Sequence, residues 1–420
     1  MVDLPGLRAT DPAALHAATD GWTALSKECR QAVDDIHDNG VNPVKANWQD
    51  RVGRLAGPKL AQQADILEAG ADIMRGVAMV LGGLTAEVAQ ARSVLAHALD
   101  LAASHGFTVD DGTGQVRPDD ASKDPAAADA VQEVNALLWE ALREATQADC
   151  SAAAELRRLG AATGETRPDI ALNSLQGGAS QVELAMYTGG IPDGKDPRLV
   201  AAWWRGLDST RQRQLELSDP VTLANLPGIP EDVRQELRGG PGAKYDRVKL
   251  VQWALDHWND DSTDLDADNC TNFASQALHE AGVRYDGWNT LDDDGWVRGG
   301  SDTSGFGLDA ILPQHTHAWG GAQNMHDFMV AHGGQEIPQD QVRPGDLVYY
   351  EEDSDQDDQD GKGQIHHTAV VTAVTPDGDV RYTQHSGDMR NGSLGGRIDA
   401  FQEGRGHQKL HFVRVNPDWY

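Results

Sequence analysis

Across most of residues 11–160 of this 420-residue chain, apolar side chains recur every three or four residues. Such spacing lines one face of an α-helix with apolar side chains. The repeat continues through three segments, at about residues 15–33, 58–103 and 124–160, and a turn-rich strand pair is expected at 107–118. Long helices joined by short breaks are typical of helical bundles and hairpins. The N-terminal half is therefore predicted to be helical, apart from the strand pair.

After residue 165 the pattern changes twice. Short helical runs alternate with Pro and Gly breaks over residues 166–244, as in a connector built of small helices. From residue 245 two helical patterns precede runs typical of β-strands, such as DLVYY, HTAVVTAVT and RYTQHS. We therefore predict a multidomain chain, with an all-α helical bundle or hairpin domain at 1–165, a helical connector at 166–244 and an α+β domain at 245–420.

The chain is strongly acidic, with a formal net charge of −31. Residues 245–420 alone hold 31 Asp and Glu against 12 Lys and Arg. Such a surface repels nucleic acid and anionic lipid, so neither is expected as a partner. The apolar run at 76–84 is too short to span a membrane. No Sec-type signal peptide is found at the start of the chain, so the protein is expected either to be secreted by another route or to stay in the cytoplasm.

Three cysteines, Cys29, Cys150 and Cys270, are too few for a disulfide framework and lack the spacing of a zinc site. The histidine-rich stretches at 315–317 and 366–367 also lack a third ligand at helical spacing. A resident metal is therefore not expected.

Cys270 begins a short helical pattern in the stretch DADNCTNFASQALHEAG, residues 266–282. A free Cys is most often a buried and inert side chain. At a helix N-terminus, however, the helix dipole favours the thiolate and makes the thiol a nucleophile. Asp268 or Asn269 is expected to cap this helix. A neighbouring base would decide between the two interpretations.

A candidate base follows on the predicted strands. The turn from Thr375 to Asp379 (TPDGD) favours a three-residue hairpin loop in which these two residues face each other. In that register His367 and His385 share one face of the sheet as diagonal neighbours, roughly 5–8 Å apart, and His366 points to the other face. A two-residue turn would move the register by one and select His366. The hairpin therefore predicts His367 as the base.

Thiol hydrolases use a Cys at a helix start as nucleophile and an imidazole on a nearby strand as base. The imidazole takes the thiol proton and later protonates the leaving amine, while a third polar group keeps the ring in the productive tautomer. We predict Cys270 as the nucleophile, His367 as the base and His385 as the orienting group. The chain order of Cys, His and a third polar residue is that of papain-like enzymes.

Five sequence blocks resemble the Cys/His amidase domain family, which is related to the NlpC-type papain-like cell-wall peptidases. They lie in the family's order within residues 245–416 and read DNCTNFASQAL, HAWGGAQNMHDFMVAHGG, PGDLVYY, HHTAVVT and YTQHS. The resemblance implies an α+β papain-like fold and hydrolysis of an amide or peptide bond through a thioester. It implies the same three catalytic residues, and neither a metal nor an organic cofactor.

The same resemblance implies supporting positions around the nucleophile. The matching polar residues are Thr271, Asn272, Ser275 and Gln276. Asn269 also belongs to this supporting set, but it stands where the family usually has Asp, directly before the Cys. This departure affects the expected cap of the helix that begins at Cys270 and leaves the three catalytic residues unchanged. The oxyanion hole is expected to include the Cys270 backbone N–H.

The N-terminal half is similar to the helical-hairpin substrates of type VII secretion in actinobacteria. The similarity rests on the helix–turn–helix pattern and on WQDRVG (48–53), a loose form of their Trp-x-Gly turn. The Tyr-x-x-x-Asp/Glu export signal expected after the second helix is missing from this region. The similarity implies a secretion-system or immunity-protein partner for the helical half.

Three functions are compatible with these patterns. The first is a thiol amidase or peptidase that cleaves cell-wall (peptidoglycan) peptide, for remodelling or as an exported antibacterial effector. The second is a protein-modifying toxin on the same fold, such as a deamidase or transferase. The third is a non-enzymatic secretion or scaffold protein with a degenerate catalytic domain, and the complete Cys/His/His set argues against it.

Overall fold

The computed structural model describes residues 2–118, 125–192, 194–265, 269–287, 289–291, 294–299, 313–353, 362–396 and 408–420. The chain divides into two compact units, Met1–Ile191 and Pro192–Tyr420. The division falls inside the segment 166–244, so the first part of that segment packs with the helical unit. None of the described helices combines the length and apolar character needed to cross a membrane.

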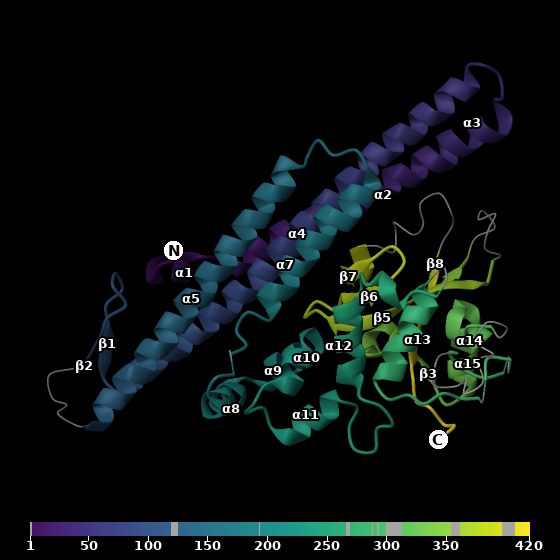
Figure 1. The fold of residues 1–420 in the computed structure, drawn as a ribbon. Coiled ribbons are helices and arrows are strands. Elements are labelled where there is room, and N and C mark those ends of the chain that lie inside the picture. Colours follow the sequence, from purple (N-terminus) through teal and green to yellow (C-terminus); the bar gives the residue numbers. More distant parts are fainter. Residues whose placement is uncertain are drawn as a thin grey trace. The chain divides into compact units, whose positions relative to one another are not determined.

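The N-terminal unit consists mainly of long helices, as the apolar repeat predicts. Its elements are α1 (Leu4–Ala9), α2 (Pro12–Ile36), η1 (His37–Val41), α3 (Asn42–Asn47), α4 (Gly53–Ser104), β1 (Phe107–Val109), β2 (Val116–Pro118), α5 (Pro125–Ala161), α6 (Pro168–Ile170), η2 (Ala171–Gln176) and α7 (Gly177–Tyr187). Helix α4 is the centre of the unit and contacts α2, α5 and α7 (Figure 1). Strands β1 and β2 form the predicted antiparallel pair.

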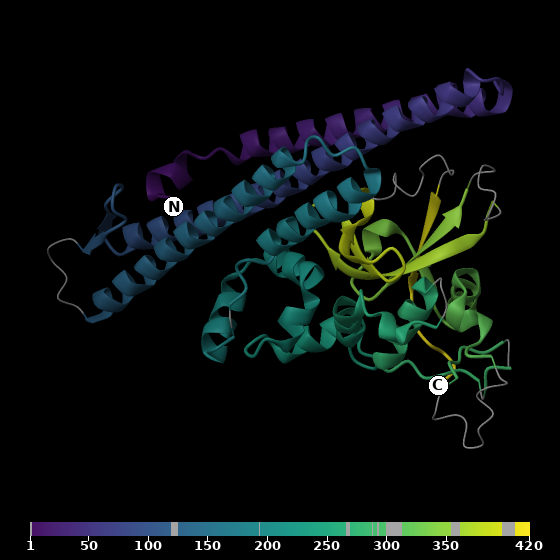
Figure 2. The ribbon, with the colours of Figure 1, turned by 45° about the horizontal axis from the view of Figure 1, so that its top comes forward.

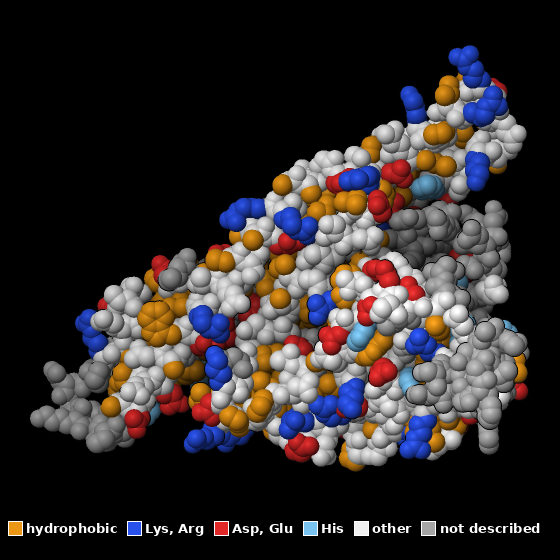
Figure 3. All heavy atoms as spheres, in the orientation of Figure 1, with side chains coloured by type: hydrophobic (Ala, Val, Ile, Leu, Met, Phe, Trp, Pro, Cys, Tyr) orange, Lys and Arg blue, Asp and Glu red, His pale blue; other side chains and the backbone are white. Residues whose placement is uncertain are grey.

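The turn between α2 and α4 exposes both apolar and basic side chains. Trp48, Val52 and Leu55 are exposed, and Figure 3 shows Lys and Arg side chains gathered at the same end of the hairpin. At Gly53 the backbone passes so close to Trp48 that an added Cβ would meet its carbonyl oxygen at 1.8 Å. The WQDRVG turn therefore requires glycine at its last position.

Helix α2 packs on α4 through a less apolar face than the repeat predicts. Val33 is buried, but Trp22 and Leu25 are 38% and 41% exposed. Ser26 is buried instead, and its hydroxyl donates a hydrogen bond to the carbonyl of Ala71 on α4 (2.8 Å). Polar groups that are paired across the contact thus replace part of the expected apolar stripe.

One of these polar pairs makes a testable contribution to stability. Arg30 of α2 forms an ion pair with Asp72 of α4, whose side chain is fully buried. The variant Asp72→Ala should lower the free energy of unfolding by about 3–5 kcal/mol, because it leaves a buried charge without its partner. The double variant Arg30→Met/Asp72→Leu should recover most of that loss, since it buries no charge. Urea unfolding followed by circular dichroism measures both, and equal losses would contradict the explanation.

The C-terminal unit combines helices with one six-stranded sheet, which confirms the predicted α+β class. Its helices are α8 (Pro197–Gly206), α9 (Ser209–Ser218), α10 (Pro220–Asn225), α11 (Glu231–Leu237), α12 (Arg247–His257), η3 (Asp261–Thr263), α13 (Cys270–Glu280), α14 (His317–Gly320), α15 (Ala322–Ala331) and η4 (Gln339–Gln341). Its strands are β3 (Gln335–Ile337), β4 (Leu347–Glu352), β5 (Ile365–Val374), β6 (Val380–Gln384), β7 (Met389–Ser393) and β8 (Gln408–Arg414). All neighbouring strands are antiparallel, in the order β3-β8-β4-β5-β6-β7.

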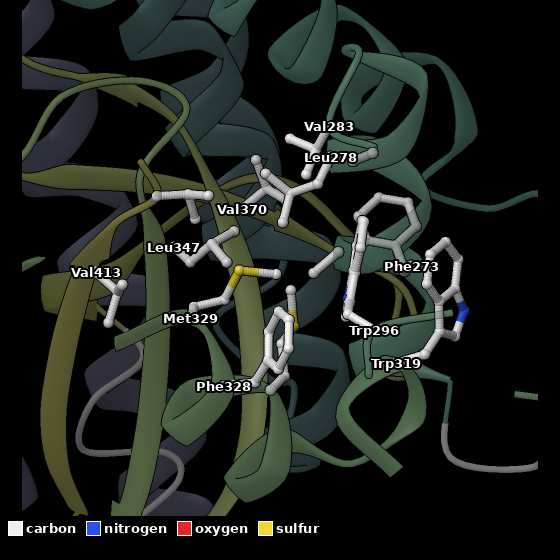
Figure 4. Close-up of a cluster of buried hydrophobic side chains, with 14 of the residues drawn as sticks. Phe273, Leu278, Val283, Trp296, Trp319, Phe328, Met329, Leu347, Val370 and Val413 are labelled. Atoms are coloured by element: carbon white, nitrogen blue, oxygen red, sulfur yellow. The ribbon is translucent and has the colours of Figure 1, made fainter. Parts of the chain in front are cut away.

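The sheet is covered on one face by helices, and both faces contribute to a core. Alternate residues of a strand point to opposite faces, so Leu347 and Tyr349 join one core while Val348 and Tyr350 join the other. The first core lies under α12, α13 and α15, which contact β5 (Figure 2). Figure 4 shows Phe273 and Leu278 of α13 in this core, together with aromatic and aliphatic side chains from the strands and from α15. Helix α13 is therefore held firmly against the middle of the sheet.

The hairpin between β5 and β6 contains the predicted three-residue turn, followed by a β-bulge. The Thr375 N–H donates to the Asp379 carbonyl (3.0 Å), and Gly378 has φ of +88°. The pairing is Val374 with Val380 and Ala373 with Arg381, then Val371 with Tyr382 and Val370 with Thr383. One residue of β5, Thr372, is thus extra, and the register beyond it differs by one from the register at the turn.

Candidate active site

Cys270 is the first residue of α13 and is 7% exposed. The helix begins here because Phe273, Ala274, Ala277 and Leu278 form an apolar face that packs into the core. Asn269 is the N-cap residue, but its side chain makes no capping hydrogen bond to the backbone. The other expected cap, Asp268, lies outside the described residues. The thiol therefore sits at a helix start that the side chain of Asn269 does not cap, where the dipole favours negative charge.

The His367 side chain lies beside this thiol. Burial alone raises the pKa of Cys270, but the charge of His367 and a hydrogen bond from its ring outweigh burial and lower the pKa to about 7. A backbone contact with Thr368 and the Thr271 hydroxyl act in the same direction. The structure thus brings the predicted nucleophile and base together, with the thiol close to half ionised at neutral pH.

Gln384, at the end of β6, holds the ring of His367. Its side-chain amide donates from Nε2 to the carbonyls of Ser386 (3.1 Å) and Gly387 (2.9 Å). This fixes the amide orientation, and Oε1 faces His367 Nε2 at 2.7 Å. Because an amide oxygen only accepts, His367 Nε2 must carry the proton. The other ring nitrogen, Nδ1, is then the basic one in the neutral ring and is available to the thiol.

The structure places Gln384 next to the ring of His367, and not the predicted orienting residue His385; the β-bulge explains the difference. In the register set by the turn alone, His385 would share a face with His367. The extra residue at Thr372 shifts the pairing by one, so Gln384 takes that place on the face of His367 instead. His366 is the extra residue of a second irregularity, where Tyr350 pairs with His367 but Glu351 pairs with Ile365, and its Nε2 contacts Gln408 Oε1 of β8 (2.7 Å).

His385 occupies a separate acidic group near the start of α13. Its Nδ1 lies 2.9 Å from the Trp258 carbonyl and 3.0 Å from Asp388 Oδ1, and its Nε2 lies 2.9 Å from Asp264 Oδ1. Burial lowers the pKa of His385, but the Trp258 carbonyl and the carboxylates of Asp388 and Asp264 more than offset this and raise it. Both ring nitrogens are engaged, so the ring cannot also orient His367.

This group anchors the residue before the nucleophile. Asn269 donates from its side chain to Asp264 Oδ1, the same oxygen that His385 contacts. The Asn269 backbone N–H donates to Ser386 Oγ (2.8 Å), and Ser386 has φ of +81°. Such a φ is unusual for a residue with a side chain and is found where surrounding contacts impose it. His385 is thus a positioning residue for the start of α13.

The supporting residues on α13 are all buried, but they have different contacts. Thr271 Oγ1 lies 3.7 Å from Cys270 Sγ. Asn272 donates to Asn269 Oδ1 (2.6 Å) and accepts from the indole N–H of Trp319 (2.8 Å). Ser275 donates to the Trp319 carbonyl (2.9 Å). Of the set, Thr271 touches the thiol, Asn272 and Ser275 fasten the helix to its surroundings, and Gln276 is buried on the same helix.

The sequence interpretation missed Gln384, Asp264 and Ser386 as members of this site. A signal for the bulge was present, because Thr372 interrupts the apolar run AVVTAV. Its hydroxyl lies 3.1 Å from that of Thr383 and donates to Asn391 Oδ1 (2.6 Å), so the extra residue is fixed by polar contacts on β6 and β7. A polar residue in a buried strand can mark such an irregularity.

Two groups of described residues have the composition of a metal site. One is Asp261, His385 and Asp388, beside the start of α13. The other is His326, Glu336 and His411, on α15, β3 and β8. Neither includes the thiol or His367, so the chemistry of the Cys/His pair does not depend on either group.

Residues 244–406 match the family model described as "Putative amidase domain". Over 141 residues the chain is 27% identical to "Uncharacterized protein YhbB" of Bacillus subtilis (strain 168), and the match covers 32% of this chain and 39% of that protein. The similarity thus spans well under half of this relative. No solved structure gives a significant match. The family match supports an amidase-like C-terminal domain.

The Cys270–His367 contact predicts how the thiol reacts with pH. Alkylation of Cys270 by iodoacetamide should increase with pH through a midpoint near 7, since only the thiolate reacts. In His367→Ala the thiol stays buried but loses its charge partner, so its pKa should rise and labelling at pH 7 should slow by about tenfold or more. Mass spectrometry of the labelled peptides follows Cys270 separately. His366→Ala is the matched control, and an equal midpoint in all three proteins would contradict the pairing.

Proposed function

We propose that the C-terminal domain is a thiol-dependent amidase or peptidase. One observation supports it most directly, namely that the Cys270 thiol at the start of α13 lies beside His367, whose ring is held by Gln384. The arrangement resembles that expected of a papain-like site, with an amide in place of the predicted second histidine. The match to an amidase domain agrees with the same class of reaction.

The reaction follows from the tautomer of His367. Its Nδ1 takes the proton from Cys270, and the thiolate sulfur attacks the carbonyl carbon of the amide. The resulting oxyanion accepts a hydrogen bond from the Cys270 backbone N–H, one of the first-turn groups that no side-chain cap from Asn269 covers. The imidazolium then protonates the leaving amine, and the C–N bond breaks to give a thioester. Water, deprotonated by the neutral ring, hydrolyses the thioester and releases the acid.

The surroundings favour a substrate that carries a positive charge near the scissile amide. Asp261, Asp264 and Asp388 surround His385 close to the start of α13 and are partly or fully exposed. A cell-wall peptide with a free amino group has this character, and we propose peptidoglycan peptide as the substrate, in wall remodelling or as an exported antibacterial effector. Export and a secretion-system or immunity-protein partner for the helical unit are further parts of this proposal.

The decisive experiment is mass analysis of soluble peptidoglycan fragments after incubation with the protein. The active protein should produce fragments with a new amine and a new carboxylate at one peptide bond, and Cys270→Ala should produce none while remaining folded. Cleavage by the alanine variant would exclude the thiol mechanism. Inertness toward all wall fragments, combined with Cys270-dependent conversion of protein glutamines, would indicate a deamidase or transferase on the same site instead.

Kinetic variants separate the roles of His367, Gln384 and His366. His367→Ala should lower kcat/KM by about 10²–10⁴-fold, as loss of a general base does. Gln384→Met keeps the volume but removes the acceptor, so the ring loses its fixed tautomer and kcat/KM should fall by about 10²-fold. His366→Ala should cost far less, because the Nε2 of that ring contacts Gln408 of β8 and not the ring of His367. Equal activity of Gln384→Met and the unaltered protein would show that Gln384 does not orient the base.

A further inference from the structure

Two histidines and a glutamate from three separate elements meet at the β3 end of the sheet. His326 Nε2 of α15 and His411 Nδ1 of β8 lie 3.0 Å and 3.1 Å from the same oxygen, Glu336 Oε1 of β3. The three atoms lie within 4.8 Å of one another. The imidazoles are only 11% and 13% exposed, while the glutamate is 51% exposed, so the group is enclosed by protein and open on one side.

We infer that His326, Glu336 and His411 form a binding site for a divalent transition metal of the zinc class. Neutral imidazole nitrogens and a carboxylate oxygen are the ligands that zinc takes when three protein groups bind it. In a tetrahedral site with bonds of about 2.0–2.1 Å, neighbouring ligand atoms lie about 3.3 Å apart. The two nitrogen–oxygen distances of 3.0 and 3.1 Å are close to that value. A water molecule would take the fourth position on the open side.

The outer ring nitrogens have the partners that such a site needs. His326 Nδ1 lies 3.0 Å from Asp327 Oδ1, and His411 Nε2 lies 2.5 Å from Glu351 Oε2. A carboxylate on the far nitrogen of a metal-binding histidine fixes the tautomer and leaves the near nitrogen free to bind the ion. Both histidines have this arrangement here, although they come from different elements.

A count of donors and acceptors points the same way. All four ring nitrogens of His326 and His411 face carboxylate oxygens, which only accept. Two neutral imidazoles supply only two N–H donors. If these two N–H groups donate to Asp327 and Glu351, then His326 Nε2, His411 Nδ1 and Glu336 Oε1 face one another with lone pairs only. A cation bound between these three atoms removes that repulsion. Two imidazolium rings would also remove it, and the experiment below separates the two cases.

A metal ion at this site would crosslink the edge strand β3 to α15 and β8. Strand β3 has three residues and pairs only with β8 among the described strands, while α15 packs against β5 and β8. One ion would link all three elements through side chains. The ligands do not include any residue of the Cys/His pair, so metal binding and amide hydrolysis can be tested independently.

The full-length protein in a Cys270→Ala background tests the site without competition from the thiol. Titration with Zn²⁺ against a chromophoric chelator should give one ion per chain, and Co²⁺ should give the visible absorption of a tetrahedral site. Glu336→Gln, a change of an exposed side chain that should leave the fold intact, and His411→Ala should each abolish this binding. Glu351→Gln should weaken it by about 10–100-fold.

Two matched variants complete the design. His385→Ala removes the histidine of the other acidic group, and His366→Ala removes a half-buried strand histidine outside both groups; both should bind Zn²⁺ as the background protein does. The inference is overturned if no ion binds, if binding survives Glu336→Gln, or if His385→Ala is the variant that loses it. Absence of zinc binding with an active enzyme would overturn the metal site and leave the proposed hydrolase intact.

Discussion

The contact between Cys270 and His367 is the interaction on which the proposed chemistry of this protein depends. Ionisation of a thiol that is only 7% exposed carries a desolvation penalty, so burial alone would raise the pKa of Cys270 and keep the thiol protonated. The imidazole reverses that balance, and it can do so only because α13 and β5 hold the two side chains together. The packing of Phe273 and Leu278 against the sheet is therefore also part of the chemistry, since it fixes the distance between the thiol and its base.

One extra residue in β5 decides which neighbour completes this pair. Because side chains alternate across a strand, the bulge at Thr372 exchanges His385 for Gln384 on the face that His367 occupies. The exchange has an electrostatic consequence. A neutral amide fixes the tautomer without adding a charge next to His367, while the second histidine remains with the carboxylates of Asp264 and Asp388 and anchors the start of α13. Two polar residues that are adjacent in sequence thus serve two different parts of the site.

A feature could be predicted from the sequence where local spacing sets it, and could not where contacts between distant elements set it. Helical periodicity located the long helices within a few residues, because it is a local property, and the hairpin turn was predicted correctly for the same reason. The proximity of Cys270 and His367 could also be predicted, since a helix start and a strand position follow from spacing. The contact of Gln384 with His367 could not, because the bulge depends on hydrogen bonds of Thr372 to Thr383 and Asn391 on two other strands. The His326–Glu336–His411 cluster was missed because its members come from three elements with no common sequence spacing.

The separation of these elements along the chain also bears on when the protein can become active. The loop closed by the contact of Cys270 with β5 is about a hundred residues long, and closing such a loop costs entropy that only later packing repays. The helix and the strand each form from local interactions, but the thiol meets its base only when most of the C-terminal unit has been synthesised and has folded. A nascent or partly unfolded chain therefore carries an ordinary, protonated cysteine. In the proposed mechanism the thiol is therefore unreactive during synthesis and in any unfolded state, and it becomes a nucleophile only in the native fold.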